Sequence, residues 1–320
     1  MSRLRPDRTL VDRLARDMAV LAPDGPWALA VSGGPDSLAL LLLAAAAGTP
    51  VLAATVDHRL RPESAGEARF VAELCGELGV PHEILAVSVR TSGTGLQAAA
   101  RQARYAALAG WMARHAATTL LTAHHADDQA ETLLMRLQRG SGVGGLAGVR
   151  ARGGLPGSEG RLSVVRPLLG WRRRELAAIV EAAGLQAVDD PSNADPDFDR
   201  VRMRARMAGT EWLDIPALAR SAAALAEADE ALDAIASQLF EERAQREGGL
   251  SLDAAGLPPE LQRRLVLRCL QSIAPGAAPR GEQLTSLLAA LAKDQVATLA
   301  GVKCTGGARW RFEPAPPRSA

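Results

Sequence analysis

Two patterns of apolar and polar residues follow one another repeatedly along the first two-thirds of the chain. Short apolar runs have the length of buried strands, and they occupy residues 27–31, 51–56, 82–87 and 118–122. Longer segments with apolar residues at helical spacing lie beside them, at residues 1–21, 38–47, 64–78 and 97–113. Strands that alternate with helices predict an α/β domain, in which a parallel sheet carries helices on both faces.

The pattern becomes helical in the second half of the chain. Helical spacing predicts helices at about residues 127–139 and 171–183, and then one long helix over residues 215–247. Two shorter helical segments and a short β-like tail follow, at residues 259–272, 281–292 and 296–312. A length of 320 residues suits two domains. We therefore predict a catalytic domain over residues 1–215, and a helical connector with a small, mostly helical C-terminal domain over residues 216–320.

A glycine turn connects the first strand to the helix that follows it. Its residues are Ser32, Gly33, Gly34, Pro35, Asp36 and Ser37. Backbone N–H groups and the positive end of a helix dipole converge at such a turn, so it predicts a phosphate site, with Asp36 placed to hold a divalent cation. A Walker loop is excluded because no lysine follows the turn. Residues 140–145 match the dinucleotide fingerprint, but they follow a helical pattern and are interpreted as a loop.

Polar residues follow two further strands at their carboxyl ends, which line the ligand crevice of a parallel sheet. Asp57 and His58 follow the second strand, and residues 123–132 follow the fourth. The latter stretch holds two histidines and the acids Asp127, Asp128 and Glu131 at the start of a helix. Helix capping alone explains one such acid. Zinc is disfavoured because the H-E-x-x-H spacing is absent, whereas Mg²⁺ and an amine substrate suit the carboxylates.

The arginines are unevenly distributed along a chain whose formal net charge is only +1. Thirteen arginines face eight acids between Arg136 and Arg206. Arg101 and Arg104 share one face of a predicted helix, where two guanidinium groups are able to grip a phosphate. A nucleic-acid backbone and an ordinary solvated surface both remain open explanations.

The remaining composition points to the cytoplasm. Three cysteines are far apart in the sequence and form no C-x-x-C motif, which indicates reduced thiols. The chain shows no signal peptide, and the run at residues 38–48 is too short to span a membrane. We expect no membrane partner. The sequence leaves the oligomeric state open, a homodimer included.

The glycine turn resembles the pyrophosphate loop, or PP-loop, of the N-type ATP pyrophosphatases. Taken together, five stretches resemble the tRNA(Ile)-lysidine synthetases in the order typical of that family; they are residues 32–37, 56–61, 123–132, 139–146 and 190–204. Two features depart from the family pattern. Val201 stands where an asparagine is often found, and the tail after residue 215 is shorter than the C-terminal domains of some members.

The resemblance implies an adenine nucleotide alpha hydrolase-like fold and a ligase that forms a C–N bond. Such an enzyme uses ATP and Mg²⁺ to adenylate the wobble cytidine of the tRNA(Ile) that carries a CAU anticodon. Free lysine then attacks C2 through its ε-amine, AMP leaves, and the tRNA reads AUA instead of AUG. Two alternatives stay open: a PP-loop tRNA thiolase, which the missing C-x-x-C disfavours, and a catalytically idle nucleotide-binding module.

The same resemblance assigns expected roles to individual residues. ATP is expected at residues 32–37 with Asp57 and His58, and Mg²⁺ at Asp36 and Glu131. Asp128 is expected to orient or deprotonate the attacking lysine, and Arg104 or Arg101 to stabilise phosphate charge. Contacts to the tRNA or its phosphates are expected from Arg101, Arg139, Arg200, Arg202 and Arg204.

Overall fold

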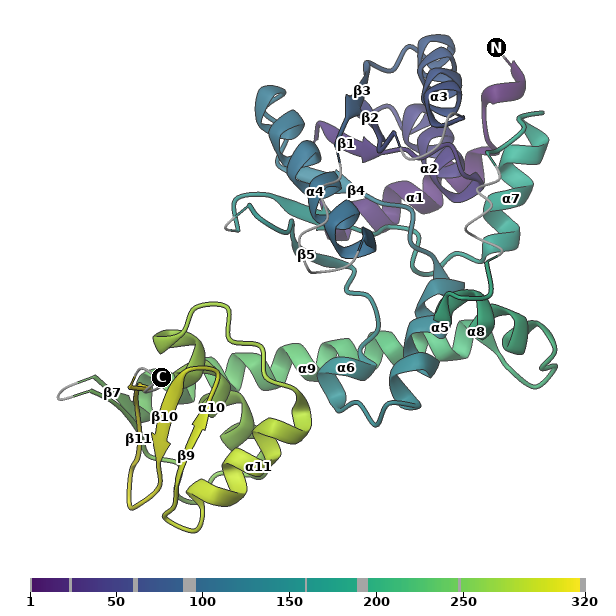
Figure 1. Ribbon diagram of the computed structural model, residues 1–320. Coiled ribbons are helices and arrows are strands. Elements are labelled where there is room, and N and C mark those ends of the chain that lie inside the picture. The colour runs from purple at the N-terminus through teal and green to yellow at the C-terminus, as the bar shows by residue number, and fades with distance from the viewer. Residues whose placement is uncertain are drawn as a thin grey trace. The chain divides into compact units, whose positions relative to one another are not determined.

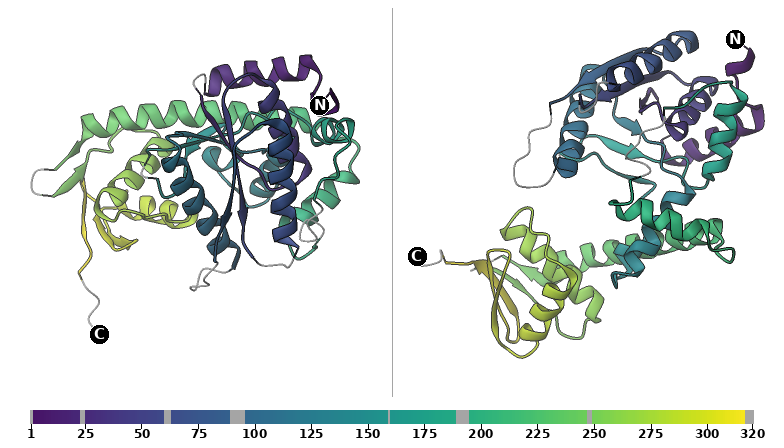
Figure 2. Two further views of the ribbon diagram at one scale, coloured as in Figure 1. Left: turned by 90° about the horizontal axis from the view of Figure 1, so that it is seen from above. Right: turned by 45° about the vertical axis from the view of Figure 1, so that its right-hand side comes forward.

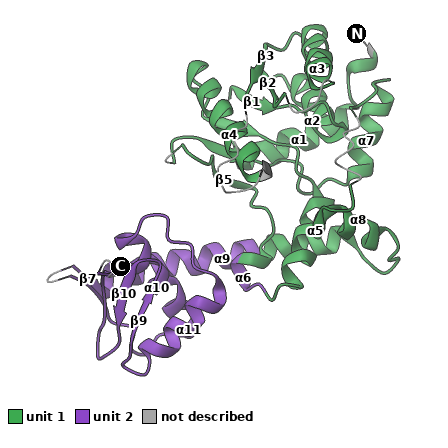
Figure 3. Ribbon diagram, viewed as in Figure 1, with its two compact units in different colours: residues 1–140, 145–224 green, residues 141–144, 225–320 purple. Residues whose placement is uncertain are grey.

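The structure is a computed structural model, and it describes residues 2–22, 25–59, 63–88, 96–158, 160–188, 195–246 and 249–316. Two parts of the motifs identified above lie outside the described residues: positions 60–61 after the second strand, and positions 190–194 of the last motif. The described chain forms two compact units, one of residues 1–140 with 145–224 and one of residues 141–144 with 225–320 (Figure 3).

Unit 1 is built on a six-stranded sheet with the order β3-β2-β1-β4-β6-β5 (Figure 1). The strands are β1 (Trp27–Ala30), β2 (Val51–Asp57), β3 (His82–Ala86), β4 (Thr119–Leu121), β5 (Arg152–Gly154) and β6 (Ser163–Val165). All neighbouring pairs are parallel except β5 and β6. The register aligns Trp27 with Val51 and Ala28 with Leu120. The carboxyl ends of β1, β2, β4 and β6 therefore meet at one edge.

Helices cover both faces of this sheet, as the sequence predicts. One face packs on η1 (Ser2–Leu4), α1 (Arg8–Leu21), α2 (Pro35–Ala46), α3 (Ser64–Leu78) and α7 (Arg173–Ala182), and the other on α4 (Leu96–Arg114). Strand residues alternate between the two cores: Leu29 belongs to the first and Ala28 to the second. In Figure 2 the helices flank the strands on both sides.

A helical layer completes unit 1 beyond the carboxyl edge of the sheet. It contains α5 (Ala126–Leu137), α8 (Asp199–Ala208) and the first part of α9 (Ile215–Arg243). The short helix α6 (Val143–Leu146) follows α5 and includes residues of both units. Ala126 and Ala130 of α5 pack on Ile215 and Ala219 of α9 in a small apolar cluster. Small side chains on α5 allow this close approach. The packing fixes the helix whose first turn carries Asp127 and Asp128.

Unit 2 has its own core and its own sheet. Helices α10 (Pro259–Ile273) and α11 (Gly281–Leu291) pack on five antiparallel strands in the order β7-β8-β11-β10-β9. These strands are β7 (Ala244–Gln245), β8 (Leu250–Leu252), β9 (Val296–Leu299), β10 (Val302–Thr305) and β11 (Trp310–Pro314). Helix α9 runs from one unit into the other. The two units divide after residue 224, within this helix, and the domain boundary after residue 215 stays a prediction.

The main difference from the sequence prediction concerns the shortest strands. Strands β5, β6, β7 and β8 were not predicted, and none exceeds three residues. Each is too short to give an alternating pattern, and two carry polar or glycine residues in place of an apolar run. They form because a neighbouring strand supplies the partner for their backbone hydrogen bonds.

The three cysteines are free and buried in the cores. Burial raises the pKa of Cys75 and of Cys269 to about 12, and that of Cys304 to about 11. These thiols are therefore poor nucleophiles at neutral pH. Among the described helices, none has both the length and the apolar character needed to cross a membrane.

Helix α2 is the central element of unit 1, because every residue from Ser37 to Ala44 is buried. We expect Leu41→Ala to lower the free energy of unfolding by about 2–5 kcal/mol, the usual effect of a cavity at a fully buried leucine. Denaturant titration followed by circular dichroism measures it. Val20→Ala, at an 84% exposed position, is the control and should change stability by under about 0.5 kcal/mol. A Leu41→Ala protein as stable as this control contradicts the placement of α2.

Candidate active site

The PP-loop residues lie between the end of β1 and the start of α2, at the carboxyl edge of the sheet. Gly34 is the N-cap of α2 and Pro35 is its first residue, where a missing N–H is not needed. The hydroxyl of Ser37 donates to the carbonyl of Gly34 at 2.9 Å and accepts from the N–H of Ser32 at 3.1 Å. This side chain therefore closes the loop on itself and holds its shape.

Gly33 is required by the geometry of the loop. Its φ is +86°, and a Cβ there would lie 2.9 Å from Cγ2 of Val188. Its carbonyl accepts from the N–H of Val188 at 2.9 Å, so the loop is anchored to the segment after α7. The N–H groups at the start of α2, with the helix dipole behind them, have the arrangement that suits an anion, and the phosphate site here stays a prediction.

His125 connects this loop to α5. Its Nε2 lies 3.4 Å from Oδ2 of Asp36, and its ring is 1% exposed. His125 is also the N-cap of α5: its Nδ1 accepts the N–H of Asp128, while Oδ2 of Asp128 accepts the N–H of His125. Burial opposes protonation, but the nearby carboxylates of Asp36 and Asp128 raise the pKa of His125. One imidazole thus joins the two parts of the site.

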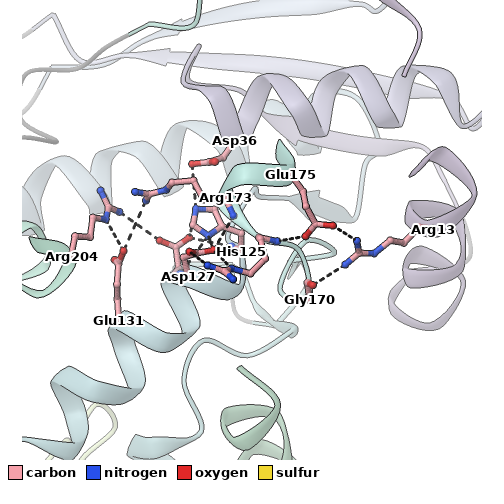
Figure 4. A network of polar contacts seen from close by, with 11 residues as sticks. Arg13, Asp36, His125, Asp127, Glu131, Gly170, Arg173, Glu175 and Arg204 are labelled. Atoms are coloured by element: carbon pink, nitrogen blue, oxygen red, sulfur yellow. Dashed lines mark hydrogen bonds and ion pairs between the residues drawn. The ribbon is translucent and has the colours of Figure 1, made fainter. Parts of the chain in front are cut away.

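Asp127 is engaged in a structural network. Its carboxylate accepts two hydrogen bonds from the guanidinium of Arg172, both at 3.2 Å, and one from the N–H of Arg173 at 2.8 Å. Burial by itself raises the pKa of Asp127, but these hydrogen bonds outweigh burial, and the pKa is lowered. The N–H of Arg172 donates to Glu175, which pairs with Arg13 of α1 at 2.8 Å (Figure 4). Asp127 therefore fixes α5 to α7.

Glu131 lies one helical turn further along α5 and is almost fully buried. Its Oε1 accepts from Nε of Arg204 at 2.6 Å, and Nη2 of Arg173 is 4.0 Å away (Figure 4). Its Oε2 has no hydrogen-bond partner among the described residues. Burial raises the pKa of Glu131, against the opposing charge of Arg204. Arg204 of α8 also reaches within 3.8 Å of Asp128, so it bridges both acids.

Three arginines lie near His124. Burial and the charges of Arg166, Arg200 and Arg101 lower the pKa of His124 to about 4, against the opposing effect of Asp128. His124 is therefore neutral at physiological pH. Arg166 donates to a backbone carbonyl, but its buried Nε has no partner among the described residues. Three guanidinium groups near one neutral imidazole form a setting suited to an anion.

The end of β2 places Asp57 and His58 at the same edge. Oδ1 of Asp57 accepts from the N–H of Arg59 at 2.9 Å and from the hydroxyl of Ser64 at 2.8 Å, so this carboxylate shapes the turn. Burial and the charge of Arg104 lower the pKa of His58, although the negative charge of Asp57 acts in the opposite direction. The guanidinium of Arg104 stacks over the ring of Tyr105, with 5.5 Å to its centroid.

The structure thus gathers most of the predicted residues and separates two of them. Arg139 and Arg202 both pair with Asp199 on an exposed part of α8, so they do not join the buried acids. Sequence analysis missed His125 and Arg166 as site residues. The position of Arg166 directly after β6 was the available signal, but that strand is too short to recognise from its residues.

Two carboxylate oxygens have the environment expected of a cation ligand. Oδ1 of Asp36 and Oε2 of Glu131 are buried and have no hydrogen-bond partner among the described residues. Asp36 fits Mg²⁺ better, because Glu131 already faces two guanidinium groups. No group of three or more His, Cys, Asp or Glu side chains in the described chain is arranged to hold a metal. Any Mg²⁺ at Asp36 needs phosphate oxygens and water as further ligands.

Comparison with known proteins agrees with this geometry. Residues 8–210 match the family described as the PP-loop domain. The chain is 44% identical to the tRNA(Ile)-lysidine synthase of Zymomonas mobilis subsp. mobilis, over 99% of this chain and 97% of the relative. It is 48% identical to that of Novosphingobium aromaticivorans, over 95% of this chain and 93% of the relative. The solved U34-tRNA thiolase NcsA from Methanococcus maripaludis shares the fold, with a TM-score of 0.53 and 16% identity over 69% of this chain and 80% of that one.

The fold and the loop together define an ATP-binding PP-loop domain. Sequence identity of more than 40% over nearly the whole chain then shows which family within this class the chain belongs to. The chain belongs to the tRNA(Ile)-lysidine synthase family.

Replacement of Arg172 tests whether the hydrogen bonds between Asp127 and Arg172 support the ATP site. We expect Arg172→Ala to weaken ATP binding about tenfold, because Asp127 loses its guanidinium and no longer fixes α5 beside the PP-loop. Isothermal titration calorimetry measures the affinity. Arg174→Ala, an exposed arginine on the same helix, is the matched control and should bind like the wild type. Equal affinity in both variants means that the network does not support the site.

Proposed function

We propose that this protein joins lysine to C2 of the wobble cytidine of the tRNA(Ile) with a CAU anticodon, with ATP as the activating substrate. The observation that carries the proposal is the contact between Asp36 and His125, which brings the PP-loop and the acids of α5 to one edge of the sheet. An activated tRNA and an amine nucleophile have to meet at one place, and this edge offers sites for both. Relatives named for this activity match nearly the whole chain.

In the first half-reaction, the C2 carbonyl oxygen attacks the α-phosphate of ATP and pyrophosphate leaves. The N–H groups of the PP-loop and the start of α2 bind the phosphates. Asp36 would hold Mg²⁺, which would supply further neutralisation of the phosphate charge. Arg101, Arg166 and Arg200 supply positive charge near His124, and Arg104 supplies it near His58. Adenylation converts a poor leaving group, the carbonyl oxygen, into a good one, AMP.

In the second half-reaction, the ε-amine of lysine attacks C2 and AMP leaves. Lysine arrives as an ammonium ion, so its binding site needs negative charge and its attack needs a proton acceptor. Asp128 and Glu131 supply both on one face of α5, while Asp127 is occupied by Arg172. We assign Asp128 to orient and deprotonate the amine. The uncommitted Oε2 of Glu131 is a second acceptor for the ammonium group.

Asp36→Ala tests the cation site. We expect the rate of pyrophosphate release to fall on the order of 10²-fold, because the loop loses the carboxylate placed for the cation. The fold should survive, since Asp36 lies in a loop-proximal helix turn and adds little to the core. The measurement is pyrophosphate release at several Mg²⁺ concentrations, with circular dichroism as the control for folding. An active variant with an unchanged Mg²⁺ requirement excludes Asp36 as the ligand.

Asp128→Asn separates the two half-reactions. Asparagine keeps an oxygen that is able to cap α5, but it neither takes a proton nor pairs with an ammonium group. We therefore expect pyrophosphate release close to that of the wild type, with lysidine formation slowed on the order of 10²-fold and a higher KM for lysine. Both products are measured on the same samples. If the two rates fall equally, Asp128 serves ATP or the metal, and the assigned role is wrong.

A further inference from the structure

One tryptophan differs from the other four. Trp27, Trp111, Trp171 and Trp310 are at most 7% exposed, whereas Trp212 is 82% exposed. Trp212 lies in the turn between α8 and α9. A tryptophan ring is a large apolar surface, and tryptophan is enriched where proteins bind other molecules.

The turn that carries Trp212 is ordered by its own hydrogen bonds. The N–H of Thr210 donates to Met207 at 3.1 Å, its hydroxyl donates to Arg206 at 2.8 Å, and the N–H of Leu213 donates back to Thr210 at 3.3 Å. The exposure of Trp212 is therefore a feature of a defined turn. A ring held outward on ordered backbone loses little conformational entropy on binding.

Both sides of this turn are attached to the helix that carries the catalytic acids. Before it, Arg204 of α8 binds Glu131 at 2.6 Å, and α8 lies beside α5 (Figure 1). After it, Ile215 at the start of α9 packs on Ala126 and Ala130 of α5, with Met207 against the same cluster. Trp212 is therefore positioned by the same contacts that position Glu131.

Helix α8, just before the turn, offers positive charge to a polyanion. It carries four arginines against the single acid Asp199; Arg200 and Arg206 are exposed, whereas Arg202 pairs with Asp199 and Arg204 with Glu131. The turn itself holds the acids Glu211 and Asp214, and Asp214 accepts the N–H of Ala217 at the start of α9. Arginines beside an exposed aromatic ring are the combination with which proteins bind single-stranded nucleic acid, the first on phosphates and the second on a base.

We propose that Trp212 is a stacking platform for an unpaired base of the RNA substrate, next to the nucleotide that reacts. The inference rests on the proposed function. A reaction at C2 requires the cytidine to leave its stack, so a neighbouring base loses a stacking partner. The exposed indole replaces that partner, while the exposed Arg200 and Arg206 of α8 contact the adjoining phosphates. Trp212 is thus a specificity and affinity residue for RNA, and it takes no part in ATP binding.

Acrylamide quenching of tryptophan fluorescence tests the proposal directly. Because the other four rings are buried, the emission that acrylamide quenches comes mainly from Trp212. A saturating concentration of the tRNA(Ile) transcript should remove most of this quenching. Continued full access of acrylamide to Trp212 in the tRNA complex overturns the proposal. Protection that grows with protein concentration in the absence of tRNA also overturns it, because it shows self-association.

Kinetics of two variants give an independent test. Trp212→Ala should raise the KM for tRNA about tenfold, the size of one base–aromatic stack, and leave the KM for ATP and for lysine unchanged. Trp212→Phe keeps an aromatic face and should restore most of the affinity. Val20→Ala, which removes an equally exposed apolar side chain from α1, should behave as the wild type. An unchanged KM for tRNA in Trp212→Ala refutes the platform.

These results are distinguishable from failure of the proposed function. If the wild-type protein binds tRNA and protects Trp212 but forms no lysidine, the platform stands and the assigned reaction fails. If lysidine forms and Trp212→Ala keeps the wild-type KM for tRNA, the reaction stands and the platform fails.

Discussion

The contact between His125 and Asp36 is the constraint on which the rest of the site depends. The PP-loop follows β1, whereas the acids of α5 follow β4, and the sheet alone only brings their starting points to one edge. The buried imidazole lies 3.4 Å from Asp36 and forms an ion pair with it when protonated, which attracts the loop and the helix to each other. The same ring caps α5, so the direction of that helix and the position of Asp36 are determined together. A small shift of either element therefore displaces the other.

Charge balance explains how so many acids remain buried at the start of one helix. Asp127 is paired with Arg172, and Glu131 with Arg204, each by direct hydrogen bonds. A buried carboxylate without such a partner would be strongly destabilising. The pairing leaves one oxygen of Glu131, and one of Asp36, without a hydrogen bond within the described chain. These oxygens are available to the cationic partners of the proposed reaction, lysine and Mg²⁺.

Much of the fold and part of the site could be predicted from the sequence. The strands β1 to β4 lie in apolar runs of sufficient length, and the PP-loop is recognisable because Gly33 meets a backbone requirement that few other residues satisfy. The pairing of Asp127 and Glu131 with arginines was not predictable. It depends on Arg172 and Arg204, which are 45 and 73 residues away from their partners along the chain. Arg139 and Arg202 matched the expected motif, yet a nearby acid, Asp199, binds both.

The central claim is that lysine becomes bonded to the wobble cytidine. Its most direct test is mass spectrometry of nucleosides after incubation of the protein with ATP, an unmodified tRNA(Ile) transcript and lysine labelled with ¹⁵N at the ε-amine. The account predicts that the wobble cytidine is replaced by a heavier nucleoside that retains the ε-¹⁵N label, and only when ATP is present. Unchanged cytidine in every digest, or a thiolated nucleoside in its place, would contradict the account.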